Sequence, residues 1–364
     1  MNKEEQILNY IRINPYISQQ QLSEKVGISR PAVANYIKKL VQSGQIKGRA
    51  YILNDQETIT CIGGANVDRK AIASQTVRLQ SSNPVNTEES LGGVARNVAE
   101  NFAKLSQTTS LITFVGQDKE GEWLLKESKR MNIDISQTAV LPNHRTGTYT
   151  ALLEPTGELV VSLADMDIYD EVTSKMIEDR WNHISSSQMI FADTNITEES
   201  LIYLINNCKK DDCQLYLDPV SSIKAEKLPE DLSGVHTLLP NQEEAEILSG
   251  VTIKEVEDCS KACEFLHARG VKQVVITLGS SGIYFSSKEN QGHIAPPKVE
   301  VVDVTGAGDA FAACLMYGQL KGESLESACR LGLSGAAITL QANDSVSPQM
   351  SAENINHMAK EFFQ

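Results

Sequence analysis

The sequence has no apolar run that could cross a membrane and no secretion signal at its start. None of its 364 residues falls in an apolar stretch of about 18 or more, the length that a membrane-spanning helix needs. The chain begins Met1-Asn2-Lys3-Glu4-Glu5, which is not the basic-then-apolar order of a signal peptide. We therefore expect a cytoplasmic protein with no membrane partner.

The cysteines show no sign of pairing. There are seven, an odd number, and none forms a C-x-x-C pair, which fits reduced thiols better than a disulfide framework. Cys259, Cys263 and His267 are spaced to share a helix face, but the sequence offers no evident fourth ligand for zinc. We expect these three side chains to pack in a helix.

Positive charge is scarce except near the N-terminus. The net charge is −14, yet residues 1–55 carry eight Lys and Arg against four Asp and Glu, which leaves −18 for residues 56–364. A basic segment joined to an acidic one is typical of a nucleic-acid-binding arm attached to an enzyme. Because 364 residues also exceed the usual size of one hydrophobic core, we predict two domains, residues 1–55 and 56–364.

The N-terminal segment has the pattern of three short helices followed by a β-ribbon. Apolar residues recur at helical spacing in three stretches between residues 7 and 41. Ser18 and Ser29 are suited to cap the second and third helices, and Gly27 is suited to end the second. Residues 45–53 alternate in polarity, as a wing would. The segment resembles the winged helix-turn-helix found at the start of many bacterial regulators.

The third predicted helix holds the candidates for DNA contact. In a helix-turn-helix the first half of this helix enters the major groove. The predicted DNA-binding residues there are Ser29, Arg30, Asn35 and Tyr36. Four basic residues are available to phosphates: Lys38, Lys39, Lys47 and Arg49. A module that serves only dimerisation or docking remains an alternative.

From residue 58 onward, short apolar strands alternate with helical segments. This alternation predicts a parallel sheet covered by helices on both faces. The predicted strands are residues 58–62, 110–115, 189–192, 214–217, 236–239 and 273–277. Residues 146–153 and 159–163 flank Glu154-Pro155-Thr156-Gly157-Glu158, which predicts a β-hairpin outside the main sheet.

A glycine-rich turn near the C-terminal end carries the strongest chemical signal, Asp303-Val304-Thr305-Gly306-Ala307-Gly308-Asp309. It follows residues 299–302, which have the pattern of a strand, and precedes residues 310–316, which favour a helix. A turn of this kind at a helix N-terminus offers backbone N–H groups and the positive end of the helix dipole to a phosphate. Asp309 can then accept the proton of a substrate hydroxyl that attacks the phosphate. We predict phosphoryl transfer with Asp309 as the base and Gly306, Ala307 and Gly308 around the anion hole.

Two commoner nucleotide-binding motifs do not fit the sequence. Phe311 stands where a dinucleotide-binding fingerprint needs its third glycine. Gly116 and Gly121 have the spacing of a P-loop, but Glu122 stands where the lysine belongs. Neither motif therefore explains the glycine-rich turn.

The turn resembles the C-terminal signature of the PfkB/ribokinase family of carbohydrate and nucleoside kinases, Asp-Thr-x-Gly-Ala-Gly-Asp, from which only Val304 departs. The resemblance extends over residues 58–364. It implies an α/β fold: a ribokinase-like three-layer α/β/α sandwich with a small β-sheet lid, preceded here by an all-α winged helix-turn-helix domain. The implied substrate-binding residues of two further motifs are Asn66, Asp68, Gly92, Gly93 and Asn97.

The resemblance also implies where ATP and its cations bind. In the family's Asn-x-x-Glu motif, Asn241 and Glu244 help to place the phosphates and Mg²⁺, the latter through water. Leu239 replaces a lysine that often precedes this motif. Further nucleotide contacts are implied for Thr277, Gly279, Gly282 and Asn343, and a monovalent cation such as K⁺ is implied at Asp303 with residues 343–347.

Four segments are similar to the pseudouridine kinases of this family: residues 82–84, 165–168, 192–196 and 218–221. The implied reaction is transfer of the ATP γ-phosphate to the 5′-hydroxyl of pseudouridine. The implied substrate contacts are Ser82, Asn83, Asp165 and Asn195. Acceptors that an incorrect base leaves unpaired would discriminate strongly between nucleosides.

The sequence leaves alternatives open for the lid residues, the substrate and the function. Ser82, Asn83 and Asp165 could be turn residues of the lid, and the substrate could be another nucleoside such as adenosine or a free sugar such as ribose or fructose. A regulator that senses a nucleoside without phosphorylating it is a further alternative, although it would have no need of Asp309. The predicted hairpin resembles the family's lid, which implies a homodimer.

Overall fold

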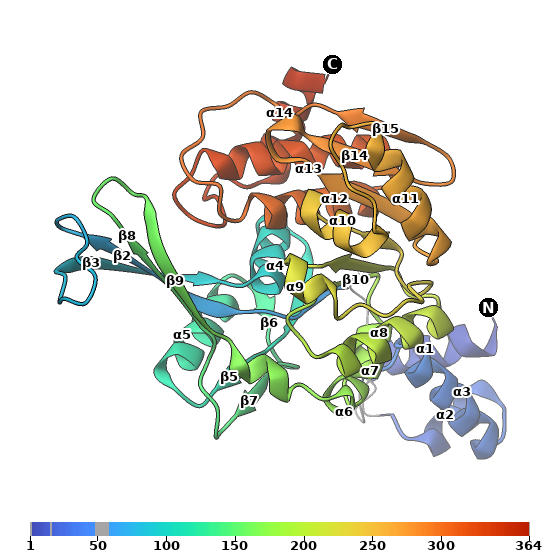
Figure 1. Cartoon of the computed structure of the whole chain (residues 1–364). Coiled ribbons are helices and arrows are strands. Elements are labelled where there is room, and N and C mark those ends of the chain that lie inside the picture. The colour runs from blue at the N-terminus through green and yellow to red at the C-terminus, as the bar shows by residue number, and fades with distance from the viewer. Residues whose placement is uncertain (1, 15–16, 48–57, 364) are drawn as a thin grey trace.

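The computed structural model describes residues 2–14, 17–47 and 58–363. They form a helical N-terminal module, a nine-stranded sheet covered by helices, and a four-stranded sheet that projects from it (Figure 1). None of the helices within these residues is long and apolar enough to span a membrane.

The N-terminal module consists of α1 (Lys3–Ile13), α2 (Gln19–Val26) and α3 (Arg30–Gln42). Ser18 and Ser29 accept hydrogen bonds from backbone N–H groups in the first turns of α2 and α3, and Gly27 ends α2 at φ +69°. Apolar residues of all three helices form a separate core. The predicted helix-turn-helix is therefore confirmed. Most of the predicted wing, residues 48–53, lies outside the described residues.

The module contacts the rest of the chain at the amino-terminal edge of the main sheet. Gly44, just after α3, is buried, and a Cβ atom on it would lie 2.0 Å from the Cβ of Ser186, which shortly precedes a central strand. The carboxyl ends of the parallel strands point away from this contact. The module and any site at those ends therefore lie on opposite edges of the sheet.

The main sheet runs in the order β15-β14-β13-β12-β11-β10-β1-β4-β6, and its strands are parallel except β14, which is antiparallel to both of its neighbours. Its strands are β1 (Thr58–Ile62), β4 (Thr108–Ile112), β6 (Ile133–Asp134), β10 (Met189–Asp193), β11 (Leu215–Asp218), β12 (Thr237–Leu238), β13 (Gln273–Thr277), β14 (Ile283–Ser286) and β15 (Gln291–Ile294). All six predicted strands are present. The second, residues 110–115, is split between β4 and β5 (Phe114–Gly116), which pairs with β7 (Ala139–Leu141).

Helices cover both faces of this sheet, as predicted. One face packs against α4 (Val94–Lys104), α12 (Ala307–Leu320), α13 (Leu325–Leu340) and α14 (Ala352–Phe363). The other packs against η1 (Asp167–Glu171), α6 (Ser174–Glu178), α7 (Trp181–Ser185), α8 (Glu198–Asp211), α9 (Ser222–Ala225), α10 (Gln242–Ser249) and α11 (Asp258–Ala268). The strands are buried on both sides, so their side chains divide between two cores.

The second sheet is a lid of four strands in the order β3-β2-β8-β9. They are β2 (Asn66–Ala73), β3 (Val85–Gly92), β8 (Thr148–Leu153) and β9 (Leu159–Asp165). The predicted hairpin is β8 and β9, closed by a turn in which Gly157 has φ +87°. Helix α5 (Lys119–Arg130) lies near the base of the lid (Figure 1).

Residues 299–302 form no strand, contrary to the prediction, because the backbone N–H of Val302 bonds to the carbonyl of Leu340 at the end of α13 and not to a neighbouring strand.

Cys259 and Cys263 lie on α11 with their side chains in the core, as expected. The ring of His267 is hydrogen bonded to Val271 O and Ser286 Oγ.

Candidate active site

Polar side chains gather at the carboxyl edge of the main sheet. Asp193 ends β10, Asp218 ends β11, and Asn241 follows β12. The glycine-rich turn reaches the same edge and leads into α12. Ligands of open α/β sheets bind at this edge, so it is the candidate active site.

Asp309 lies half-buried in the first turn of α12. Its Oδ2 accepts a hydrogen bond of 2.8 Å from the Nδ2 of Asn97 on α4, a residue 212 positions away in the sequence. Burial raises the pKa of Asp309 to about 7; the bond from Asn97 opposes this rise, and the charge of Asp193 adds to it. A carboxylate with such a pKa is suited to accept a proton near neutral pH.

The turn before Asp309 has the geometry of an anion site. Gly306 has φ +78°, and a Cβ atom there would lie 1.9 Å from the carbonyl oxygen of Ser345, so only glycine fits. Gly308 is exposed, with open space beside it. The N–H groups of Gly308 and Asp309 belong to a first helical turn, which supplies no carbonyl partner for them. They remain suited to a phosphate.

Gly92 and Gly93 lie where the lid joins the main domain. A Cβ on Gly92 would lie 2.0 Å from Asp68 Oδ2, and a Cβ on Gly93, where φ is +97°, would lie 2.4 Å from Ala65 Cα. Asp68 Oδ1 also accepts a bond of 2.5 Å from Asn66 Nδ2. In the sequence Asp68 closely follows the first predicted strand, residues 58–62, and the resemblance implies a position at the end of that strand. Asp68 lies instead on the lid strand β2, because the chain turns at Gly63 and re-pairs in the second sheet.

A buried ion pair on α4 supports Asn97, and the sequence did not predict it. Arg96 and Glu100 lie one turn apart on α4 and form a salt bridge although both are almost fully buried. The guanidinium also donates to Asn97 Oδ1 at 2.8 Å and to Leu91 O at 2.9 Å. It therefore orients the amide that holds Asp309. The (i, i+4) spacing was a signal, but it is common on exposed helix faces.

Asp193 is a second residue that was missed as part of the site. It is fully buried, and its Oδ2 accepts from the backbone N–H groups of Gly64 at 2.8 Å and Ala95 at 2.9 Å. Burial raises its pKa, and the hydrogen bonds to its carboxylate oppose that rise. The Asp193 side chain thus joins the end of β10 to the start of α4 and to the lid hinge, the Gly63–Gly64 turn that leads into β2. Its position after a parallel strand was the available signal.

Asn195 lies next to Asp193 and does not face open space. Its Nδ2 donates to Asp193 Oδ1 at 2.8 Å, and its Oδ1 accepts from Lys224 Nζ at 2.5 Å. Both ends of the amide are therefore occupied. Tyr169 supports the same region, since its hydroxyl bonds to both Ala65 N and Ala65 O.

A cavity of about 190 Å³ opens between the glycine-rich turn and the ends of β11 and β12. Its lining includes Asp309, Asp218, Glu244, Asn241 and Thr277. Burial raises the pKa of Asp218 well above its usual value, and the neighbouring carboxylates of Glu244 and Asp309 raise it further. Clustered acids of this kind favour a cation.

The cavity suits Mg²⁺ held largely through water. No group of three Asp, Glu, His or Cys side chains within the described ranges is close enough to bind a metal directly. Glu244 is already engaged by Asn241 through its backbone N–H at 2.9 Å and its Nδ2 at 2.7 Å. Mg²⁺ commonly keeps several waters and takes one or two carboxylates plus substrate phosphates. Asp218 and Glu244 fit that role.

The predicted nucleotide loop borders this cavity. Thr277 ends β13, and its N–H bonds to Pro240 O beside Asn241. Gly279 and Gly282 have φ +57° and +90° in the next turn, and a Cβ on Gly282 would lie 2.0 Å from Ile294 O. Asn343 is exposed in the loop after α13. The structure thus brings the loop that begins at Thr277 next to Asn241.

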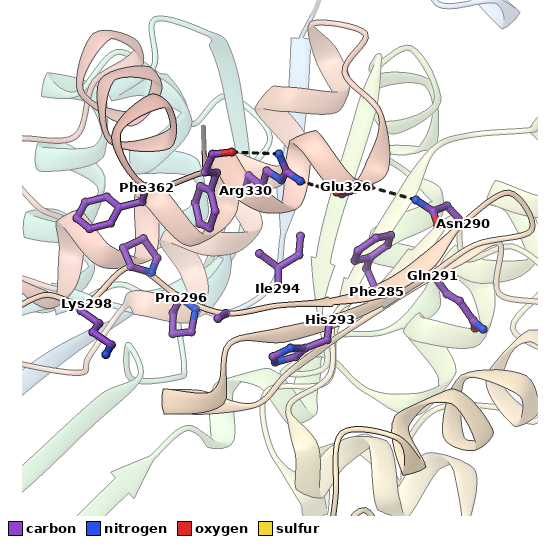
Figure 2. A pocket seen from close by; sticks show the side chains of 14 residues that line it. Phe285, Asn290, Gln291, His293, Ile294, Pro296, Lys298, Glu326, Arg330 and Phe362 are labelled. Carbon is purple, nitrogen blue, oxygen red and sulfur yellow. Dashed lines mark hydrogen bonds and ion pairs between the residues drawn. The ribbon is translucent and has the colours of Figure 1, made fainter.

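A larger cavity of about 600 Å³ runs along the edge strand β15, between it and α13 and α14 (Figure 2). Phe285, Ile294 and Phe362 line it with Arg330, whose guanidinium bonds to Glu326. None of the predicted site residues lines it. It adjoins the nucleotide loop where Ile294 meets Gly282 and where the ring of His293 is hydrogen bonded to Ser281 O.

Three predicted substrate residues are not brought into the cluster. Ser82 and Asn83 lie in the β2–β3 loop at the outer tip of the lid (Figure 1). The Asn83 amide organises that loop, since it bonds to the backbone of Arg78 and Ser81. Asp165 pairs with Thr148 on β8, and side-chain alternation places it on the lid face opposite Asp68. Their roles in substrate binding remain predictions.

The predicted DNA-binding residues are mostly accessible. Arg30 and Asn35 are exposed along α3, and Ser29 is exposed at its N-cap, where its hydroxyl accepts from Ala32 N. Tyr36 is half-buried against the core of the module. The exposed face of α3 can therefore present Arg30 and Asn35 to a groove.

Comparisons with known proteins agree with this geometry. A family described as pfkB family carbohydrate kinase matches residues 56–352, and one described as winged helix-turn-helix DNA-binding matches residues 2–47. The uncharacterized sugar kinase YeiI of Escherichia coli (strain K12) is 32% identical over 97% of each chain. The pseudouridine kinase of the same organism is 31% identical over 83% of this chain and 96% of its own.

Solved structures give the same result. A carbohydrate kinase from Agrobacterium tumefaciens has a TM-score of 0.75 and 30% identity, covering 84% of this chain and 97% of its own. Arabidopsis thaliana ribokinase, complexed with ribose and ATP, has a TM-score of 0.75 and 22% identity over 84% and 99% of the two chains. The chain therefore belongs to the pfkB family of carbohydrate kinases, phosphotransferases that act on hydroxyl groups of sugars and nucleosides, and it carries a winged helix-turn-helix module.

Proposed function

We propose that residues 56–364 form an ATP-dependent pseudouridine kinase that phosphorylates the 5′-hydroxyl of its substrate. The observation that carries the proposal is the pairing of Asp309 with Asn97 directly behind the anion site of the glycine-rich turn. The similarity to a pseudouridine kinase over 83% of the chain supports the choice of substrate. Another nucleoside or a free sugar remains the alternative.

Each residue of the site has a part in the proposed transfer. Asp309 accepts the proton of the attacking hydroxyl, and Asn97, oriented by Arg96, holds the carboxylate in place. The backbone N–H groups of Gly308 and Asp309 stabilise the charge on the transferred phosphoryl group. Asp218 and Glu244 would hold Mg²⁺, which neutralises the phosphates of ATP. Asp68 and Asn66 hold the sugar hydroxyls from the lid.

A substrate panel tests the proposal. Steady-state rates with pseudouridine, uridine, adenosine, ribose and fructose should show the highest kcat/KM for pseudouridine. A site that hydrogen bonds a ring N–H rejects an analogue without that N–H, so uridine should be the poorer substrate. A tenfold preference for a free sugar would reject the nucleoside assignment and leave the kinase assignment intact.

The pH dependence should follow Asp309. Its pKa is raised to about 7, so the carboxyl group is protonated below that pH and cannot act as a base. We expect kcat/KM, which reports ionisations of the free enzyme, to fall about tenfold per pH unit below 7 and to level off above it. A profile that stays flat from pH 5.5 to 8 would show that Asp309 does not titrate as the base.

We further propose that the N-terminal module, residues 1–55, binds DNA, and that the protein dimerises through its lid. Leu159, Val161 and Leu163 of β9 are 54%, 45% and 64% exposed, which leaves apolar surface uncovered on the lid. The module lies on the far side of the chain from the lid (Figure 1). Two modules in such a dimer would therefore contact well-separated half-sites.

Retardation of DNA from upstream of the protein's own gene tests this proposal. We expect binding at low salt that weakens steeply as salt rises, because phosphate contacts release counterions. Arg30→Ala should weaken binding, whereas Lys126→Ala, on α5 near the base of the lid, should not. No retardation at low salt would contradict DNA binding, and a monomer in light scattering at micromolar concentration would contradict the dimer.

A further inference from the structure

A lysine of the lid reaches the first aspartate of the glycine-rich turn. Lys70 Nζ lies 2.6 Å from Asp303 Oδ2, which joins residues 233 positions apart in the sequence. Lys70 lies two residues after Asp68 on β2, so strand alternation places both side chains on the same face of the lid. The ion pair therefore forms on the face that carries the proposed sugar-binding aspartate.

Asp303 has no vacant oxygen for a monovalent cation. Its Oδ1 accepts from Thr305 N at 2.8 Å and from Thr305 Oγ1 at 2.7 Å, and its Oδ2 accepts from Lys70. Although burial raises the pKa of Asp303, the hydrogen bonds from Lys70 and Thr305 outweigh it, and the pKa lies below its usual value. The residues present do not fit K⁺ at this carboxylate, because an ammonium group of the same charge is already there.

We propose that Lys70 serves as a built-in monovalent cation, whose ammonium group sits at Asp303 when the lid is closed and positions the glycine-rich turn for phosphoryl transfer. The proposal rests on the proposed kinase function and goes beyond it, since it makes activity independent of added K⁺. Lys70 is a positioning residue: it acts on the anion site through Asp303 and Thr305, which directly precede Gly306.

The location of Lys70 links this charge to lid closure. Lys70 belongs to the lid strand β2, while Asp303 belongs to the main domain. A substrate that draws Asp68 toward the site also draws Lys70 toward Asp303. The two side chains are 35% and 23% exposed, and ion pairs at such exposure contribute little to stability. The effect of removing the pair should therefore appear in activity and nucleotide binding, with little change in Tm.

Activity in two salts tests the proposal. Nucleoside phosphorylation is measured at constant ionic strength in tetramethylammonium chloride, whose cation is too large for the site, and in KCl. The wild type should be equally active in both salts, within about twofold. Lys70→Met should lose about tenfold or more in tetramethylammonium chloride and regain most of that loss in KCl, and Lys70→Arg should retain most of the activity. Lys175→Met, which removes a lysine that contacts Glu178 and Asp179 on an exposed helix, should behave as the wild type.

Calorimetric binding of a non-hydrolysable ATP analogue with Mg²⁺ gives a readout that does not need turnover. Its Kd should be the same in both salts for the wild type and should be K⁺-dependent for Lys70→Met. A wild type that needs K⁺ for activity or binding would overturn the proposal, as would a folded Lys70→Met that K⁺ fails to restore or that never loses function. A wild type that phosphorylates nothing in either salt, yet binds the analogue equally in both, would count against the kinase function alone.

Discussion

Replacement of Asp309 by Asn is expected to lower kcat at least about 100-fold, the usual contribution of a general base. The asparagine keeps the size of the side chain and an oxygen that can accept the 2.8 Å hydrogen bond from Asn97. It cannot take a proton from the substrate hydroxyl. The fold and the anion site should persist, so KM should change much less than kcat. A coupled assay with the best nucleoside of the panel measures both constants.

Asp231→Asn is the matched control for this variant. Asp231 is an exposed aspartate whose carboxylate accepts from Ser233 and Lys209, away from the glycine-rich turn. The same chemical change there should leave kcat unaltered. Full activity of Asp309→Asn would refute the assignment of the base. Losses of equal size in both variants would show that the effect is not specific to the site.

Replacement of Arg96 by Met should give the largest loss of stability. Arg96 is 5% exposed and Glu100 is 6% exposed, so the substitution leaves a carboxylate buried without its main partner. Removing one member of a buried ion pair costs about 3–5 kcal/mol. Among the ion-pair partners within the described residues, Lys104, 4.0 Å away, is the one that remains near Glu100. The free energy of unfolding in urea should fall by that amount, and kcat should fall too, because Asn97 loses the donor that orients its amide.

The double variant Arg96→Met with Glu100→Leu separates charge burial from packing. Two apolar side chains of similar volume leave no unpaired charge, and such replacements are often neutral. Stability should therefore return most of the way to that of the wild type, while activity stays low because Asn97 is still unsupported. A single variant as stable as the wild type, or a double variant less stable than the single one, would contradict this account of the pair.

Much of the fold could be predicted because its signals are local. The six strands of residues 58–62 through 273–277 are short apolar runs, and each is found where its run lies. Ser18, Ser29 and Gly27 mark helix boundaries through hydrogen bonds to residues three or four positions away. The strand predicted at residues 299–302 is absent because strand formation also needs a partner that is distant in the sequence. An apolar run of strand-like composition forms a strand only if another strand is available, and here the partner is the end of α13.

The site shows the same division. The glycine-rich turn pointed to Asp309, the family resemblance added Asn97 and Asp68, and the structure brings Asn97 into contact with Asp309. Strand pairing, by contrast, decides which side chains share a face of the lid, and no local sequence pattern specifies that pairing. That pairing places Asp165 opposite Asp68 and brings Lys70 to Asp303.

By itself the sequence determined the class of fold, the helix-turn-helix and the kinase class, since these depend on periodicity and on motifs a few residues long. Only the tertiary structure decided that Asp193 holds the lid hinge, that Arg96 supports Asn97, and that Lys70 occupies Asp303. The hinge and lysine contacts join residues 129 and 233 positions apart. Such contacts arise from the order in which strands assemble into sheets, and burial then determines which charges must be paired.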